Sequence, residues 1–403
     1  MALLSLSLLL ALIPSTEPVP IEDAPSKVRK AVDRGAGLLV DMQESLDDDK
    51  AKVEDCNEWP YEGVYRVRGE IPIGYRIGGT SISGWALCEV PGWEKRTERV
   101  EAVERATRFV LEQLDHPLME PKSLSAYDVR GWGHAYALRF LLRLRELERV
   151  PADLKDDVEA RIPWLVDAVE LMEIKNRGGW NYARSRGNDS SPSTFMTAAT
   201  LQALFAAQAQ GFAVDPEIVS RGLDVLEAAR APSGAVQYAQ RSPKDPEKGL
   251  PEDSPTQGAI GRMPVCETTL LLAGRGSVDQ VRHALDEFFE HWQFLEDRRQ
   301  KTGTHVKPYG VAPYYFFFAH GYAGQAIEML PEDEREDMRD ALRKLLWKVR
   351  ERKTGGWNDR VFERSENYGT AMSLIALWSP YMPAPAGWHE AAGEKETVEE
   401  SGG

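Results

Sequence analysis

Residues 127–136 carry the densest group of side chains that could do chemistry. If a helix has begun by Arg130, then Arg130 and His134 share one helix face and Asp128 can cap the first turn. In a functional interpretation Arg130 binds an anion, Trp132 contacts the ligand, and Asp128 and His134 are catalytic, with His134 as a general base or metal ligand. In the structural alternative, Asp128 is only a helix cap and His134 a buried side chain bonded to a backbone carbonyl.

Cys266 is the third candidate catalytic residue. It follows Pro264 within the first turn of a predicted helix, where the helix dipole favours a thiolate. Arg262 and Glu267 stand beside it and are predicted to contact a ligand. A cysteine on an apolar helix also fits a small buried hydrophobic residue, so both interpretations stay open.

Aromatic side chains gather before His320, in the run 314–318. Such runs often form core, but in a ring of helices the same helices line any central cavity. Tyr309, Tyr314 and His320 are therefore predicted to contact a ligand. An aromatic lining suits an isoprenoid chain, or sugar rings stacked on their faces.

Two further candidates, Tyr75 and Arg76, lie in a glycine-rich loop before another predicted helix. Glycines allow close approach of the backbone, so this loop is expected at the rim of a binding site. A metal is a further hypothesis: Asp128, His134, Cys266 and His320 offer donor atoms, provided that they converge. The sequence itself names no cofactor.

The elements that must position these residues repeat along the chain. Six amphipathic segments each precede a polar loop and then a segment that is apolar nearly all round, which predicts outer and inner helices. The amphipathic helices begin near Val28, Val100, Val158, Ile218, Val281 and Met338. Their apolar partners begin near Thr80, Arg130, Ser193, Pro264, Pro313 and Asn367. An open row of hairpins would expose two apolar flanks, so we expect an all-α ring, an (α/α)6 toroid.

A turn motif marks the repeat. Gly178-Gly179-Trp180-Asn181 follows the third amphipathic helix and recurs as Gly355-Gly356-Trp357-Asn358 after the sixth. Glycine permits the left-handed backbone that ends a helix, and the tryptophan that follows can seal two hairpins together.

These residues resemble those of a known family. Arg34-Gly35 with Leu38-Leu39 and Gln43 is similar to the start of the repeat of squalene-hopene cyclases, and the Gly-Gly-Trp turns are similar to its end. The chain thus resembles the prenyltransferase and squalene-hopene cyclase repeat superfamily over residues 26–382. This resemblance implies a terpenoid cyclase-like α/α toroid with a ligand cavity inside the ring.

The motifs of the enzyme branches are incomplete. The acidic run Asp47-Asp48-Asp49 lies in the first loop, not opposite an inner helix as the Asp-x-Asp-Asp of the cyclases does. The zinc-binding Asp-x-Cys of protein prenyltransferases has Pro264 in place of its Asp, before Cys266. The Cys-Gly-Glu-Gln of complement-like thioester domains is absent. The resemblance therefore implies the fold and leaves the activity open.

Composition narrows the function classes. Hydrophobic residues make up 42% of the chain and there are 11 Trp, which indicates a large buried core. The net charge of −15 disfavours nucleic-acid binding, because it repels phosphate backbones. The expected partner is a small molecule or lipid in the cavity, with peripheral membrane association at most.

The two ends of the sequence differ from the repeat. Residues 1–20 contain a short apolar run that is typical of a secretory signal peptide, which predicts a secreted or periplasmic protein. Residues 383–403 are acidic and aperiodic, and are predicted to be a disordered tail. With three cysteines, at least one thiol stays free even if Cys56 and Cys88 pair.

Three functions fit this sequence. The first is a protein that binds an isoprenoid or lipid in the ring, with or without chemistry. The second is a polysaccharide-active lyase or hydrolase, because α/α toroids also serve such enzymes and Arg130, His134, Tyr309 and Tyr314 suit an acidic sugar. The third is a scaffold that binds a partner without chemistry.

Overall fold

The computed structural model describes residues 17–45, 57–123, 128–182, 191–239 and 254–389. In these ranges the chain forms six helical hairpins, as predicted from the repeat. The outer helices are α1 (Ser26–Asp41), α3 (Thr97–Gln113), α5 (Lys155–Leu171), α7 (Pro216–Ala228), α9 (Val278–Glu296) and α11 (Glu332–Lys348). The inner helices are α2 (Ile73–Glu89), α4 (Arg130–Glu146), α6 (Thr194–Ala209), α8 (Met263–Leu272), α10 (Tyr315–Ile327) and α12 (Glu366–Trp378).

The outer and inner layers of helices differ in how their side chains are buried. In α3, Val103 and Val110 are buried while Glu101 is exposed, so one face meets the ring and the other meets water. In α6, every residue from Thr194 to Phe205 is buried, because neighbours enclose that helix on all sides. The only strands in the described part of the chain, β1 (Glu44–Ser45) and β2 (Asn57–Glu58), form a short antiparallel pair within the first hairpin.

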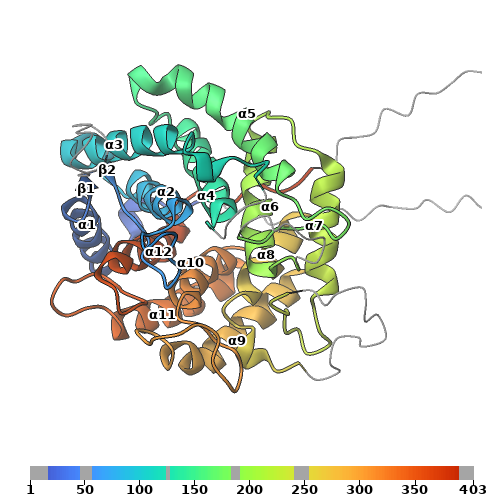
Figure 1. Ribbon diagram of the computed structural model, residues 1–403. Coiled ribbons are helices and arrows are strands. Elements are labelled where there is room, and N and C mark those ends of the chain that lie inside the picture. Colours follow the sequence, from blue (N-terminus) through green and yellow to red (C-terminus); the bar gives the residue numbers. More distant parts are fainter. Residues whose placement is uncertain (1–16, 46–56, 124–127, 183–190, 240–253, 390–403) are drawn as a thin grey trace, which may run out of the picture.

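The ring closes between its first and last hairpins. Each inner helix packs against the next, and α12 packs against both α1 and α2. Across the same junction, Nε and Nη2 of Arg34 donate to the carbonyl oxygen of Thr354, at 3.2 and 3.0 Å. Figure 1 shows the outer helices surrounding the inner ones. The predicted α/α toroid is confirmed.

Tryptophans seal the hairpins, as the turn motif predicts. Nε1 of Trp357 donates to the carbonyl oxygen of Leu346 on α11, and its backbone N–H donates to Oγ1 of Thr370 on α12. Trp180 makes the same two bonds, to Val169 on α5 and Thr197 on α6. Each tryptophan therefore ties an outer helix to the following inner helix.

The first hairpin contains a third copy that lacks the paired glycines. Nε1 of Trp59 donates to the carbonyl oxygen of Leu39 on α1, and its backbone N–H donates to Oγ1 of Thr80 on α2. The glycines matter where the backbone turns: Gly178, Gly179 and Gly355 have φ of +76°, +69° and +84°.

The chain beyond the last inner helix stays in contact with the ring. The predicted end of the toroid was residue 382, but the backbone N–H of Trp388 donates to the carbonyl oxygen of Leu272 on α8. Residues 383–389 are thus part of the packed structure, while 390–403 and 1–16 lie outside the described residues. Within the described part of the chain, no helix is long and apolar enough to span a membrane.

Candidate functional site

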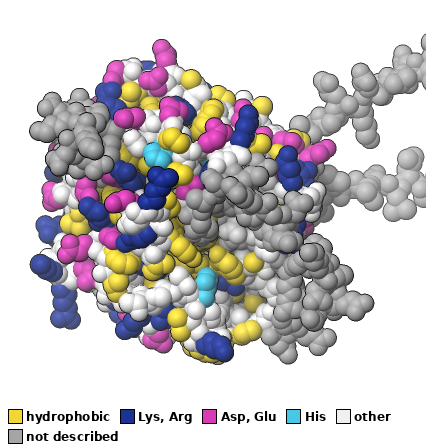
Figure 2. Space-filling view, viewed as in Figure 1, with side chains coloured by type: hydrophobic (Ala, Val, Ile, Leu, Met, Phe, Trp, Pro, Cys, Tyr) yellow, Lys and Arg dark blue, Asp and Glu magenta, His cyan; other side chains and the backbone are white. Residues whose placement is uncertain are grey.

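The inner helices all begin at the same end of the ring, which we call the N-terminal mouth. The connections that precede α2 and α12 meet there, and each brings side chains toward the ring axis. In the view of Figure 2, hydrophobic side chains reach the surface in the middle of the face and charged side chains frame them.

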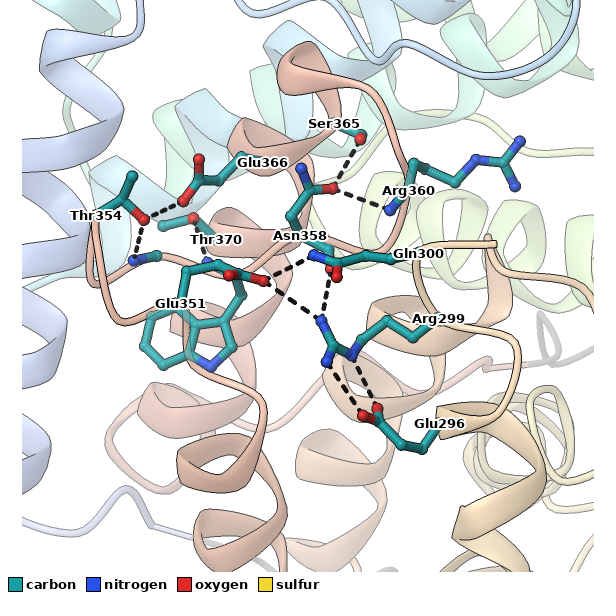
Figure 3. A network of polar contacts seen from close by, with 12 residues as sticks. Glu296, Arg299, Gln300, Glu351, Thr354, Asn358, Arg360, Ser365, Glu366 and Thr370 are labelled. Carbon is teal, nitrogen blue, oxygen red and sulfur yellow. Dashed lines mark hydrogen bonds and ion pairs between the residues drawn. The ribbon is translucent and has the colours of Figure 1, made fainter. Parts of the chain in front are cut away.

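The loop of residues 355–365 is held rigidly at the mouth (Figure 3). Oδ1 of Asn358 accepts hydrogen bonds from the backbone N–H of Arg360 (2.9 Å) and from Oγ of Ser365 (2.8 Å). The backbone N–H of Gln300 donates to the carbonyl oxygen of Asp359 at 2.8 Å. These bonds engage the backbone of both Asp359 and Arg360 and leave their side chains for other contacts.

Asp359 is a fully buried carboxylic acid. Oδ2 accepts a hydrogen bond from the hydroxyl of Tyr61 at 3.4 Å, and Oδ1 has no hydrogen-bond partner among the described residues. Burial raises the pKa of Asp359 to about 7, against the opposing charge of Arg360. Near neutral pH this carboxyl therefore exists in both protonation states, as a general acid requires.

Arg360 is buried, and among the described residues it forms no ion pair within salt-bridge distance, although its charge acts on the carboxyl of Asp359. Its exposed fraction is 2%, and within the described ranges Nε and Nη1 have no hydrogen-bond partner. In Figure 3 its side chain extends away from the polar network that holds its backbone. Burying these N–H groups without acceptors is unfavourable, so this guanidinium is a candidate for binding an oxyanion.

Four aromatic rings surround these two side chains. The ring of Tyr61 lies 4.6 Å from Tyr368, 5.3 Å from Tyr75 and 5.8 Å from Trp132, measured between centroids. Burial raises the pKa of both Tyr61 and Tyr368, and the carboxyl of Asp359 raises both further. The tyrosines thus remain neutral hydrogen-bond donors beside the acid.

A second group of polar and aromatic side chains lies at the mouth, next to the starts of α8 and α10. Nε of Arg262 donates to the carbonyl oxygen of Val236 at 2.7 Å, and its guanidinium lies 5.8 Å from the ring of Tyr315. The hydroxyl of Tyr314 lies 2.9 Å from Nε2 of His305. Arg262 is 8% exposed, so it is oriented by its carbonyl partner rather than by water.

Of the residues predicted from the sequence, Tyr75, Trp132, Arg262 and Tyr314 lie at this mouth. Tyr75 and Trp132 meet edge to face at 5.4 Å. These four remain candidates for ligand contact.

Asp128 and Arg130 instead form a buried ion pair with each other. Oδ1 of Asp128 accepts from the backbone N–H of Arg130 at 3.1 Å and from its Nε at 2.9 Å. Arg130 also donates to the carbonyl oxygens of Glu120 and Ser123. With these partners the guanidinium is committed to the loop before α4, an ion pair that neither interpretation of the sequence included.

The two predicted histidines point into the packed layers between helices. Nδ1 of His134 lies 3.1 Å from Sδ of Met172, and burial lowers the pKa of His134 to about 3. Nε2 of His320 accepts from Nε1 of Trp292 at 2.9 Å, while Nδ1 lies 2.6 Å from the carbonyl oxygen of Phe316. Burial lowers the pKa of His320 to about 4, so both rings are neutral, and Nε2 of His134 is buried without a hydrogen-bond partner among the described residues.

Cys266 and Glu267 are also engaged within the protein. Sγ of Cys266 donates to the carbonyl oxygen of Thr194 at 3.7 Å, and burial raises the thiol pKa, which outweighs the helix dipole. Glu267 pairs with Arg230 at 2.5 Å. Cys88 is likewise a free buried thiol.

The last two predicted ligand contacts lie toward the outer layer. Arg76 forms a bidentate ion pair with Glu58 and lies over the ring of Phe109. Tyr309 packs edge to face against Phe294 of α9, at 4.9 Å.

The proposed metal donors do not converge. In the described part of the chain, the residues whose possible donor atoms all lie within 4.8 Å of one another are Glu287, Glu290 and His291 on α9. None of the four residues in the metal hypothesis belongs to this group. Glu287 and His291 are partly exposed and Glu290 is exposed. The structure thus argues against a shared metal site of Asp128, His134, Cys266 and His320.

Sequence reasoning missed Asp359 and Arg360. They directly follow the Gly355-Gly356-Trp357-Asn358 turn, so a signal was present. An adjacent acid and base in a loop usually form a solvated turn, and only the fold shows both side chains to be buried.

Comparisons with known proteins bear on the fold. No family model matches the chain, and no curated protein is similar to it in sequence. Among solved structures, an unsaturated glucuronyl hydrolase from Bacillus sp. GL1, responsible for glycosaminoglycan degradation, has a TM-score of 0.56 and 13% identity; the match covers 91% of this chain and 100% of that one.

A variant of a type II terpene cyclase from Scytonema, in complex with geranylgeranyl dihydroxybenzoate, has a TM-score of 0.52 and 12% identity. That match covers 88% of this chain and 98% of the cyclase. The chain is an α/α toroid. At these identities the likeness establishes the fold alone, and the toroid's activity has to be argued from its own residues.

Proposed function

We propose that the N-terminal mouth of this toroid is the active site of an enzyme that binds an anionic, largely apolar molecule and protonates it. The observation that carries the proposal is the buried guanidinium of Arg360, whose Nε and Nη1 have no hydrogen-bond partner among the described residues and which is next to Asp359 in sequence. A bound carboxylate or phosphate would supply the missing charge.

Each group at the mouth has a role in this proposal. Arg360 binds the oxyanion of the ligand, and the protonated carboxyl of Asp359 acts as the general acid. The hydroxyl of Tyr61 orients that carboxyl by its hydrogen bond to Oδ2. The rings of Trp132 and Tyr368 cover the apolar part of the ligand and stabilise positive charge that develops on protonation.

An isoprenoid or related lipid with an acidic group is the ligand that we favour. The aromatic cluster supports this choice, and a structural neighbour, the terpene cyclase, is bound to an isoprenoid benzoate. The second candidate is an acidic sugar, because Arg360 suits a uronate carboxylate and another neighbour is a glucuronyl hydrolase.

Two measurements test the proposal. Mass spectrometry of an organic extract of the purified protein should find a bound isoprenoid or lipid acid. With a substrate in hand, Asp359→Asn should lower the turnover rate by about 10²- to 10⁴-fold while binding is kept, as expected for loss of a general acid. Loss of ultraviolet absorbance from unsaturated uronates would instead favour the sugar. If Asp359→Asn and Arg360→Met both leave binding and turnover intact, the mouth is not an active site.

We further propose that the protein is exported, with residues 1–20 as the signal. The apolar run at Leu3–Leu12 supports this proposal. Cell fractionation with amino-terminal sequencing of the recovered protein tests it, and an unprocessed protein in the cytoplasm would refute it.

A further inference from the structure

The opposite end of the ring, where the inner helices end, contains a cavity of about 380 Å³. Side chains of α2, α4, α6, α10 and α12 line it. This volume lies within the range of small-molecule sites. The hydroxyls of Tyr136 and Tyr322 meet at 3.3 Å on the ring axis; Tyr322 faces the cavity, whereas Tyr136 packs against Trp132 of the mouth. An aromatic layer therefore separates this cavity from the N-terminal mouth.

The chain after α12 closes the outer side of the cavity. We call residues 382–389 the strap; residues 382–386 form part of the cavity wall. At its far end, the ring of Trp388 packs against Phe205 at 5.7 Å, and Gln208 exchanges two hydrogen bonds with the backbone of His389, at 2.7 and 3.0 Å. The strap thus spans the ring end from α12 to α6.

The walls of the cavity combine apolar and charged side chains, and one positive charge, Arg139, has no ion pair among the described residues. Leu142, Ala206, Met372 and Ile375 supply apolar surface. The guanidinium of Arg139 lies 4.2 Å from the centre of the Trp85 ring, and its Nη1 donates to Oε1 of Gln202 at 3.2 Å. Among the described residues, Arg139 has no carboxylate partner.

Most of the other charged side chains in the lining are paired, with Glu17 the exception among the described residues. Arg143 bonds to Glu89 and Glu146, and Glu328 bonds to Arg339. In contrast, Oε1 of Gln325 is buried in the lining with no hydrogen-bond partner in the described structure. The cation of Arg139 therefore remains available to an anionic ligand, whereas Oε1 of Gln325 could accept only from a donor such as water.

We propose that this cavity binds an aliphatic carboxylic acid, with the carboxylate on Arg139 and the alkyl chain against Met372 and Ile375. A single arginine balances one negative charge, and the nearby carboxylates of Glu89, Glu146 and Glu328 disfavour a doubly charged phosphate. The apolar walls bind the chain by excluding water from it. This site is separate from the mouth and does not depend on the function proposed there.

The proposal is tested by titrating the full chain, freed of bound lipid, with dodecanoate in a calorimeter. Dodecanol and dodecyl phosphate serve as neutral and more highly charged comparisons. We expect dodecanoate to bind most tightly, and Arg139→Gln to weaken it by about ten- to a hundredfold, as for loss of a charge-assisted hydrogen bond. Arg145→Gln is the matched control, because Arg145 is on the same helix and pairs with Glu159 near the surface.

A second variant, Ala206→Phe, tests the proposal even if Arg139→Gln fails to fold. Ala206→Phe should fill the cavity and abolish binding while the helical circular dichroism and the thermal midpoint stay near those of the native chain. The proposal is overturned if dodecanoate does not bind, if dodecanol binds equally well, or if Arg139→Gln and Arg145→Gln bind alike. Arg360→Met, which should remove ligand binding at the mouth, should leave dodecanoate binding unchanged, and this result separates the two sites.

Discussion

The hydroxyl of Tyr61 lies 3.4 Å from Oδ2 of Asp359, although 298 positions separate the two residues. Tyr61 belongs to the connection within the first hairpin, and Asp359 belongs to that of the sixth. The environment of the buried acid is therefore assembled only when the ring has closed. Its properties should report both on the chemistry of the mouth and on the integrity of the fold.

Asp359 should make the protein less stable as the pH rises. An unfolded aspartate titrates near 3.8 and the folded one near 7, so the folded chain retains a proton that the unfolded chain has released. Between about pH 4 and pH 7, this group should lower the free energy of unfolding by up to about 4 kcal/mol. Urea denaturation of Asp359→Asn should lack this component, and identical pH profiles of variant and native chain would contradict the raised pKa.

Arg360→Met should stabilise the ligand-free protein while it removes ligand binding. Replacing a buried charge that forms no ion pair among the described residues with an apolar side chain of similar length should raise the free energy of unfolding by about 1–4 kcal/mol. Chemical denaturation measures this gain. Arg299→Met is the comparison, because Arg299 bonds to Glu296 and to the carbonyl oxygen of Asn358 and its loss should destabilise. A destabilised Arg360→Met would show that Arg360 has a structural partner.

Asp128→Ala should destabilise the fold severely, because it leaves the guanidinium of Arg130 buried without its carboxylate. The expected loss is about 3–5 kcal/mol in the free energy of unfolding. The double variant Asp128→Ala with Arg130→Met should recover part of that loss. If the single variant is as stable as the native chain, the pair is not the structural unit described above.

Thr370→Val and Thr197→Val should each destabilise by about 1–3 kcal/mol, because each leaves the backbone N–H of a buried tryptophan without an acceptor. The two losses should be similar, since the seams are equivalent. Ser373→Ala is a control in α12, the helix that contains Thr370. The hydroxyl of Ser373 donates to the carbonyl oxygen of Gly369 in that same helix. Thermal denaturation of the three variants gives the comparison.

Burial of His134 and His320 should make the protein less stable as the pH falls, whereas burial of Asp359 makes it less stable as the pH rises. Their folded pKa values of about 3 and about 4 lie below the unfolded value of 6.5, so the unfolded chain binds protons first as the pH falls. Stability should therefore decline below about pH 6.5. His320→Asn should flatten the decline when the pH dependence of denaturation is compared with that of the native chain. An unchanged slope would mean that His320 is charged in the folded protein.

The ring could be predicted from the sequence because its signals are periodic and local. The apolar pattern of the six hairpins and the recurring Gly-Gly-Trp turn depend on residues a few positions apart. Even so, the acceptor hydroxyl lies 13 residues after Trp357 but 17 residues after Trp180, because the rotation of the inner helix decides which side chain faces the tryptophan.

The candidate site could be predicted only in part. Trp132 was expected at the start of an inner helix, and it lies in the first turn of α4, whereas Tyr75 was expected in a loop but lies in the first turn of α2. Both remain candidates because the starts of the inner helices face one mouth. His134 and Cys266 are on equally suitable helices but point into packed layers, which depends on rotation about the helix axis. Asp359 and Arg360 were missed because burial of a loop depends on distant segments, here Tyr61 above all.

The closure between α1 and α12 also constrains the order in which the protein can be completed during synthesis. The apolar flanks of α1 and α2 are covered by the last hairpin, and Arg34 finds its carbonyl acceptor only at Thr354. A ribosome-bound chain that lacks α12 therefore keeps the apolar flanks of α1 and α2 exposed, however many other hairpins have formed. Conversely, because first and last hairpins are neighbours, a circular permutant that is opened between any two hairpins should rebuild the same ring.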